Sequence, residues 1–211
     1  MRFLRDNGLT LTLTAAFLFC LVGMLLAGWQ SHNEDLAAHH AALLSLWDYA
    51  GSGDFISAVF ENWESEFLQM AVYVVLTAYL FQRGSAESRD PDEPGREGDA
   101  EEDVPYRSHP LLGFLYAHSL GIVLALLFVA SFVLHWQGSL AAANQEAALH
   151  GGEIKSAFSY LADAQFWFES MQNWQSEFLS TAVLVVLSIF LRYRGSPESK
   201  PVGAADSTTG G

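Results

Sequence analysis

Residues 62–88 read NWESEFLQMAVYVVLTAYLFQRGSAES, and residues 173–199 read NWQSEFLSTAVLVVLSIFLRYRGSPES. The second stretch follows the first at a constant offset of 111, and the two agree at 17 of their 27 positions. Each stretch begins with a polar segment that contains a tryptophan, continues with an apolar run and ends with the motif RGSxES. A repeat of this length predicts a structural duplication, so we expect the chain to consist of two copies of one unit.

A longer apolar run precedes each repeated stretch. Residues 9–29 and 111–136 contain no Asp, Glu, Lys or Arg. At 1.5 Å per residue, a helix over the first run spans about 30 Å, the hydrocarbon thickness of a bilayer. The repeated runs reach a similar length when they are counted from Trp63 and Trp174. The sequence therefore predicts an all-α membrane protein with four transmembrane helices, at about residues 9–29, 63–82, 111–136 and 174–193.

Two other interpretations of the apolar runs are weaker. Arg2 and Arg5 followed by an apolar run, with Ala27 as a cleavage position, resemble a signal peptide. The first run, however, has a counterpart at residues 111–136, inside the chain, which cannot be a signal sequence. Burial in a soluble core is disfavoured because a 211-residue soluble protein hardly needs four such segments. We therefore expect the first run to be retained as a helix.

Composition excludes several classes of function. The chain is 51% hydrophobic yet carries a net charge of −14, so apolar and acidic residues occupy different segments. Such an acidic balance argues against nucleic-acid binding, which requires Lys and Arg facing phosphates. Cys20 is the single cysteine, which excludes an intramolecular disulfide and a cysteine-based zinc site.

The basic residues predict the orientation in the membrane. Nine of the ten lie on one side of a four-span arrangement, and only Lys155 lies on the other. The positive-inside rule then places both termini and the central segment in the cytoplasm. The two repeats are therefore parallel and related by a pseudo-twofold axis along the membrane normal. Trp29 and Trp136 correspond at an offset of 107, which implies an insertion or deletion of about four residues. Together with Trp63 and Trp174 they are expected to mark the outer interface of the membrane.

The chain divides into two two-helix repeats, residues 1–88 and 111–199, joined by a linker and followed by a tail. The linker, residues 89–110, is rich in acids and prolines and is expected to be a flexible cytoplasmic tether. The tail, residues 200–211, is rich in Gly, Ser and Thr and is expected to be disordered. The outer loops mix aromatic and aliphatic residues, which is typical of short amphipathic helices.

Glu66 and Glu177 are the candidate functional pair. They hold the same position in the two repeats, and each lies 17 residues before an arginine, about 25 Å along a helix. That spacing places both carboxylates at the outer hydrocarbon boundary. Two interpretations stay open: the pair shares a proton or a cation across the bundle, or each glutamate is solvated in the first turn of its helix. Asn62 and Asn173, four residues earlier, are expected to begin or cap that turn.

Other chemistry is weakly indicated. His32, His39, His40 and His150 lie in the outer loops near several acids, but no HExxH or similarly compact ligand spacing occurs. No nucleophile elbow, phosphate-binding loop or dinucleotide fingerprint is present. We therefore expect no catalytic residue, no metal and no cofactor. Asn62, Trp63, Asn173 and Trp174 form an interfacial motif of the repeat.

The repeated stretch and the opening FLRDNGL (residues 3–9) resemble a bacterial family of integral membrane proteins, a domain of unknown function whose hallmark is this duplicated motif. The resemblance covers nearly the whole chain and implies a bacterial inner-membrane protein, but it carries over no activity or catalytic residue. We expect a non-enzymatic structural or interaction role, with the lipid bilayer and further copies of the chain as partners. The alternative is a small-solute or ion transporter that uses Glu66 and Glu177.

Overall fold

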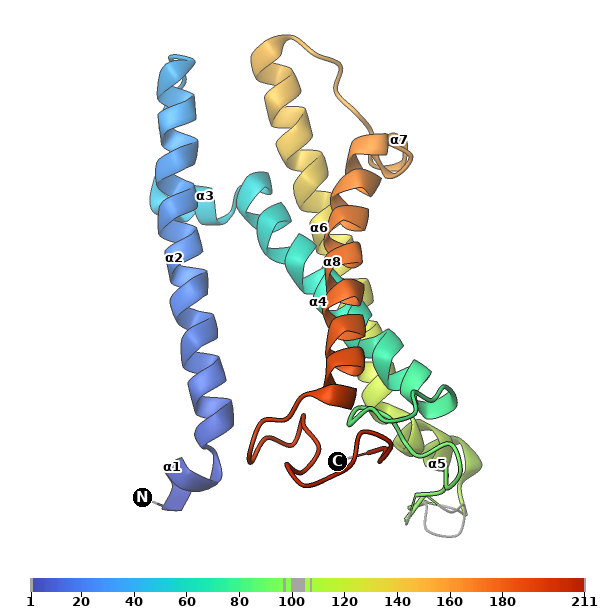
Figure 1. Cartoon of the computed structure of the whole chain (residues 1–211). Coiled ribbons are helices and arrows are strands. Elements are labelled where there is room, and N and C mark those ends of the chain that lie inside the picture. The colour runs from blue at the N-terminus through green and yellow to red at the C-terminus, as the bar shows by residue number, and fades with distance from the viewer. Residues whose placement is uncertain (1, 97, 100–104, 107, 211) are drawn as a thin grey trace. The chain divides into compact units, whose positions relative to one another are not determined.

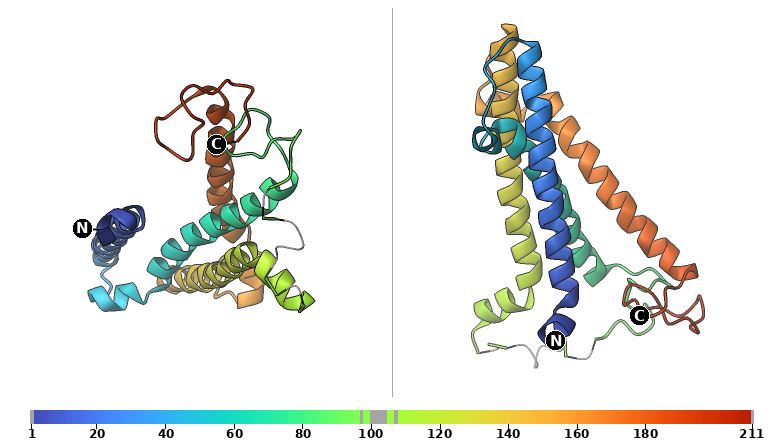
Figure 2. Two further views of the ribbon diagram at one scale, coloured as in Figure 1. Left: turned by 90° about the horizontal axis from the view of Figure 1, so that it is seen from below. Right: turned by 90° about the vertical axis from the view of Figure 1, so that its left-hand side faces the viewer.

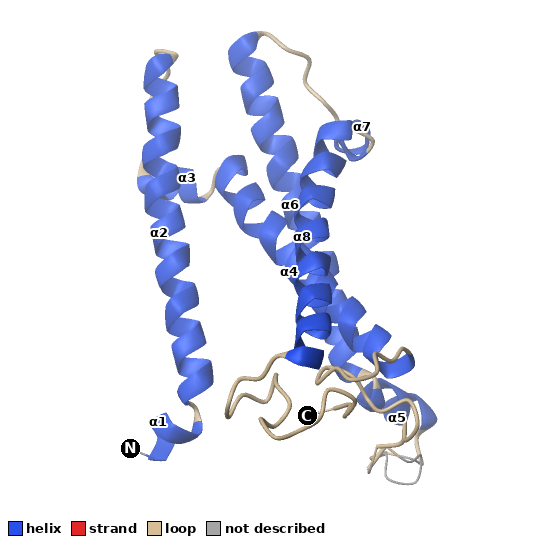
Figure 3. Ribbon diagram, viewed as in Figure 1, coloured by secondary structure: helices blue, strands red, loops and turns tan. Residues whose placement is uncertain are grey.

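The computed structural model describes residues 2–96, 98–99, 105–106 and 108–210, in which all regular secondary structure is helical. This confirms the all-α prediction. The helices are α1 (Arg2–Asp6), α2 (Gly8–Ala38), α3 (Leu46–Ala50), α4 (Gly53–Tyr79), α5 (Pro110–Ala117), α6 (Ser119–His150), α7 (Ala157–Leu161) and α8 (Ala164–Phe190) (Figure 1, Figure 3). Part of the predicted acidic linker, residues 97, 100–104 and 107, lies outside the described residues.

The chain forms two compact units. Unit 1 comprises Met1–Val59 and Leu134–Tyr160, and unit 2 comprises Phe60–Val133 and Leu161–Gly211. Both units draw on both halves of the sequence, because α4 and α6 each pass from one unit into the other.

Helices α2 and α6 are long and apolar. They have 31 and 32 residues, and among the described residues they are the two that are long and apolar enough to cross a membrane. Each extends well beyond the predicted run at its C-terminal end. Helices α4 and α8 have 27 residues each, but acids interrupt them, at Asp54, Glu61, Glu64 and Glu66 in α4 and at Glu169 and Glu177 in α8. The structure therefore supports a membrane protein on the evidence of α2 and α6.

The apolar run at residues 111–136 is not one helix, which corrects the prediction of a single span there. Helix α5 ends at Ala117, and α6 begins at Ser119 after His118. The His118 ring nitrogen Nδ1 lies 2.9 Å from the carbonyl oxygen of Phe114, so the side chain bonds to the end of α5. Asn7 occupies the equivalent place between α1 and α2, and its side-chain amide donates to Phe3 O at 3.0 Å. A polar side chain thus binds the end of each short helix.

The loops that follow α2 and α6 are held by matching hydrogen bonds. In the first, Leu44 N donates to Asn33 Oδ1 at 2.8 Å and Asn33 Nδ2 donates back to Leu44 O at 3.0 Å. In the second, Lys155 and Asn144 exchange the same two bonds at the same distances. The amide side chain mimics a backbone partner and fixes where the chain turns back.

A tyrosine of each short helix packs against the preceding long helix. Tyr49 of α3 lies against Gly28, where an added Cβ would clash with the tyrosine hydroxyl. Tyr160 of α7 shares a hydrogen bond of 2.6 Å with Ser139. Gly28 and Ser139 correspond at the offset of 111, as do the two tyrosines. The matched contacts keep this offset across the region, so the predicted correspondence of Trp29 with Trp136 at an offset of 107 is wrong.

Within unit 1, α4 and α6 cross at close range through two glycines. A Cβ added at Gly53 would lie 2.5 Å from Ala142 N and 2.7 Å from Gly138 O. A Cβ added at Gly138 would lie 2.6 Å from Ser57 N. Real Cβ atoms do not approach backbone atoms so closely, so only glycine permits this crossing.

Candidate functional site

Glu66 and Glu177 lie near the middle of α4 and α8, both in unit 2. The two helices begin at Gly53 and Ala164, thirteen residues before these glutamates. The two glutamates therefore do not lie in a first helical turn, and a helix dipole, which acts over only one turn, does not stabilise them. The carboxylates are close enough to repel each other electrostatically. The two glutamates thus hold equivalent places on two helices of one unit.

Asn62 and Asn173 are not helix caps, because both lie inside their helices. The Asn173 side-chain amide instead donates to the carboxylate of Glu61 on α4. Helix α8 is capped by Asp163, whose side chain accepts from Gln165 N at 3.0 Å. The repeated asparagine of α8 therefore connects two helices and does not start one.

The tryptophan that follows Asn173 also joins α8 to α4. Trp174 Nε1 donates to Glu64 Oε1 at 2.8 Å, and Glu64 is completely buried. The Trp174 ring also meets the Phe128 ring of α6 edge to face, with 6.1 Å between centroids. Gln175 occupies the place of Glu64 in the second copy, so the two copies differ in charge at this position. Trp63 packs its ring against Phe60, 5.1 Å away, on its own helix.

A polar stripe runs along α4 on both sides of Glu66. Its members, at helical spacing on one face, are Asn62, Glu66, Gln69, Tyr73 and Thr77. Gln69 Nε2 donates to Thr181 Oγ1 of α8 at 2.5 Å. Polar side chains between apolar helices hold such helices together when they bond to one another.

Beyond these contacts, α4 and α8 diverge toward their C-terminal ends (Figure 1, Figure 2). A cavity of about 350 Å³ lies between them. Its walls are aliphatic and aromatic, formed by residues such as Val72, Leu76, Phe178, Ala182, Val185 and Val186. Its polar end is formed by Tyr73, Gln82, Glu87 and Ser88. We call this cavity the α4–α8 cleft.

The polar end of the cleft is lined by Glu87, and its neighbour Glu198 is the equivalent residue of the second copy. Tyr73 Oη donates to Glu87 Oε2 at 3.1 Å, and Glu198 lies near enough to act on the Glu87 carboxyl. A second carboxylate nearby disfavours the charged form of a carboxyl group. Burial and the neighbouring Glu198 raise the pKa of Glu87 above its ordinary value, although the Tyr73 hydroxyl opposes this shift. Glu87 and Glu198 correspond at the offset of 111, and sequence reasoning missed them.

The RGSxES segments that carry these carboxyls form matching turns. Gln82 N donates to Ser88 Oγ at 2.8 Å, and Tyr193 N donates to Ser199 Oγ at the same distance. Both turns need a glycine with positive φ, and Gly84 and Gly195 each have φ +85°. The repeated motif is therefore a turn that presents one glutamate from each half of the chain.

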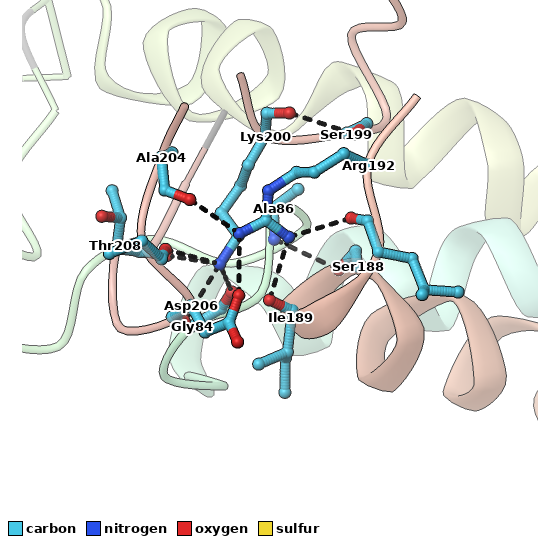
Figure 4. A network of polar contacts seen from close by, with 12 residues as sticks. Gly84, Ala86, Ser188, Ile189, Arg192, Ser199, Lys200, Ala204, Asp206 and Thr208 are labelled. Atoms are coloured by element: carbon cyan, nitrogen blue, oxygen red, sulfur yellow. Dashed lines mark hydrogen bonds and ion pairs between the residues drawn. The ribbon is translucent and has the colours of Figure 1, made fainter. Parts of the chain in front are cut away.

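The C-terminal segment differs from the disordered tail that its composition predicts. Lys200 is 1% exposed and donates to the carbonyl oxygens of Gly84 at 2.5 Å, Thr208 at 2.9 Å and Asp206 at 3.0 Å (Figure 4). Gly210 N donates to Ser85 O at 2.9 Å. Burial and the nearby Arg192 lower the pKa of Lys200, and Asp206 opposes them. Residues 200–210 therefore wrap around the first RGSxES turn.

The histidines singled out in the sequence separate into different environments. His32 Nδ1 lies 3.9 Å from Asp54 Oδ2, and its ring lies 5.4 Å from that of Tyr49. His39 and His150 meet ring to ring at the ends of α2 and α6. Among the described residues, no group of three or more ligating side chains is gathered.

A family model described as Domain of unknown function (DUF6766) matches residues 1–211. No curated protein and no solved structure matches the chain.

Proposed function

Because the chain belongs to this family of unknown function, we propose a role for it from its own residues. It is a four-span protein of the bacterial cytoplasmic membrane that acts by binding and not by catalysis. Helices α2 and α6 span the bilayer, and α4 and α8 are the shorter second spans of two parallel repeats. Support comes from the lengths of α2 and α6, from the position of nine of the ten basic residues on one side, and from the hydrogen bonds that recur at the offset of 111.

We expect labelling of single cysteines to report both termini in the cytoplasm. Cys20 is exposed, so it is first replaced by alanine. An impermeant maleimide added to intact cells should then label Ser45→Cys and Lys155→Cys, and it should label Gly95→Cys only after permeabilisation. Labelling of Gly95→Cys in intact cells would contradict this topology.

The observation that carries the binding role is the α4–α8 cleft with its acid pair. An apolar cavity of about 350 Å³ that ends in polar groups suits an amphiphilic molecule. Glu87 lines that end with Glu198 as its neighbour, so the end carries negative charge once Glu87 ionises above its raised pKa. The ligand that complements this charge is a lipophilic cation, whose apolar body fills the cleft while its positive charge lies near the carboxyls.

Two ions of nearly identical shape and opposite charge test this role. Purified full-length protein in uncharged detergent should bind tetraphenylphosphonium, measured by equilibrium dialysis, and should not bind tetraphenylborate. The double variant Glu87→Gln/Glu198→Gln should weaken cation binding about tenfold or more, because it removes the opposing charge. Affinity should fall as the pH falls through the raised pKa of Glu87, since protons then compete with the ligand.

A matched pair of variants locates the binding. Val185 lines the cleft, whereas Val183, on the same helix, is 44% exposed and does not. Val185→Trp should fill the cleft and abolish binding, and Val183→Trp should leave it unchanged. Equal uptake of both ions, insensitive to Val185→Trp, would mean that the ions only partition into detergent and would overturn the proposal.

A second candidate function, transport, is favoured by one observation: Glu66 and Glu177 hold equivalent places on α4 and α8 within one unit. From this pair the stripe of Gln69 and Tyr73 leads to Glu87. The two roles differ in one measurement, the uptake of tetraphenylphosphonium into proteoliposomes driven by a pH gradient. Uptake that is lost in Glu66→Gln while binding persists would indicate transport; binding without uptake would indicate the first role alone.

A further inference from the structure

His39 and His150 are equivalent residues of the two halves, related by the offset of 111. They lie at the C-terminal ends of α2 and α6, and both belong to unit 1. Their ring centroids are 5.2 Å apart, and the ring planes are nearly perpendicular at 82°. Each follows an acid by four residues, Asp35 on α2 and Glu146 on α6. Duplication has therefore placed two acid–histidine pairs against each other.

The surroundings of His39 determine which ring nitrogen is available. His39 Nδ1 lies 2.9 Å from the carbonyl oxygen of Asp35 and 3.6 Å from its carboxylate. In the neutral ring this Nδ1–H donates to the carbonyl, so Nε2 carries the free lone pair. Histidines that bind metals are oriented in this way, with one nitrogen on a carbonyl or carboxylate and the other on the ion.

We propose that His39 and His150 bind one divalent transition-metal ion, of the class of Zn²⁺, between the ends of α2 and α6. An ion held by both Nε2 atoms at about 2.0–2.1 Å with a tetrahedral angle sets the two ring centroids about 5 Å apart. The observed separation of 5.2 Å matches this requirement. Both side chains are exposed, so the ion enters directly from solvent.

The site has two adjacent histidine rings and open positions for other ligands. No third ligating side chain is gathered there in the described part of the chain. Water completes the coordination, and Glu146, one turn before His150 on the same helix, supplies a carboxylate within reach of a side-chain rotation. The bound ion cross-links the ends of two long helices. This site is independent of the α4–α8 cleft, which lies in unit 2.

Titration of the full-length protein with Zn²⁺ tests the site. The protein carries no polyhistidine tag and has Cys20→Ala, so that Cys20 does not bind the ion. Calorimetry should give one Zn²⁺ per chain, and Zn²⁺ should raise the unfolding temperature whereas Mg²⁺ should not. His39→Ala and His150→Ala should each weaken binding by about tenfold or more and remove the thermal shift.

His40→Ala is the matched control, because His40 is also exposed and adjoins His39 in sequence. It should leave both the affinity and the thermal shift unchanged. With Cu²⁺ as the probe, electron paramagnetic resonance should show hyperfine splitting from two nitrogens, and from one in either alanine variant. Binding of Zn²⁺ that is equally tight in the double variant His39→Ala/His150→Ala would overturn the proposal.

Discussion

Gly138→Ala is expected to destabilise the protein by about 2 kcal/mol, because it forces apart two helices that touch through their backbones. The added Cβ would lie 2.6 Å from Ser57 N and 3.0 Å from Ser57 Cα. Neither atom belongs to a flexible side chain, so α4 itself must move. The change is measured as the free energy of unfolding of the purified protein in mixed micelles.

Gly121→Ala is the control for this prediction. Gly121 lies on the same helix, and a Cβ added there has nothing within 4 Å. Alanine at that position should be neutral or should stabilise the helix by up to about 1 kcal/mol. Equal unfolding free energies for the two variants would show that the close crossing of α4 and α6 does not exist in solution.

The helical class could be predicted from the sequence because the apolar runs and the repeat are visible without any knowledge of packing. The helix starts could not. Asn62 and Asn173 precede apolar runs, and asparagine favours N-caps, yet both lie well inside helices. The residues before them mix acids with aromatics. Such a segment becomes helical when one of its faces packs against a neighbouring helix. In α8 this face includes Phe166, whose ring centroid lies 5.6 Å from that of Phe132 on α6. Tertiary contacts therefore outweighed the local preference.

The candidate site was predicted in part. Position in the repeat was sufficient to select Glu66 and Glu177 as a pair. The same criterion applies to Glu87 and Glu198, which also belong to the 17 identical positions. They were missed because RGSxES follows an apolar run and was interpreted only as its end. A duplicated acid in a duplicated turn was the available indication. The cleft itself was not predictable, since it depends on the angle at which α4 and α8 diverge.

Lys200→Met is expected to release the C-terminal segment from the first RGSxES turn. The ammonium group donates to four carbonyl oxygens, those of Gly84, Ala205, Asp206 and Thr208 (Figure 4). An ammonium has three protons, so one proton is shared between two of these acceptors. Methionine keeps the length and the apolar stem but donates to none of them. Hydrogen bonds from a charged donor contribute about 1.5–3 kcal/mol each, so we expect the free energy of opening of this segment to fall by about 3 kcal/mol.

Hydrogen exchange at two amides reports this opening. Gly84 N donates to Thr209 Oγ1 and Gly210 N donates to Ser85 O, both at 2.9 Å. Their exchange should accelerate roughly hundredfold in Lys200→Met, the factor that corresponds to about 3 kcal/mol. The control is Lys155→Met, which removes the other of the two lysines. Lys155 is exposed and lies over the Tyr160 ring in unit 1. An amine-reactive reagent should likewise modify Lys155 and spare Lys200 in the folded protein. Modification of both lysines at the same rate would show that the carbonyl cage around Lys200 is not formed.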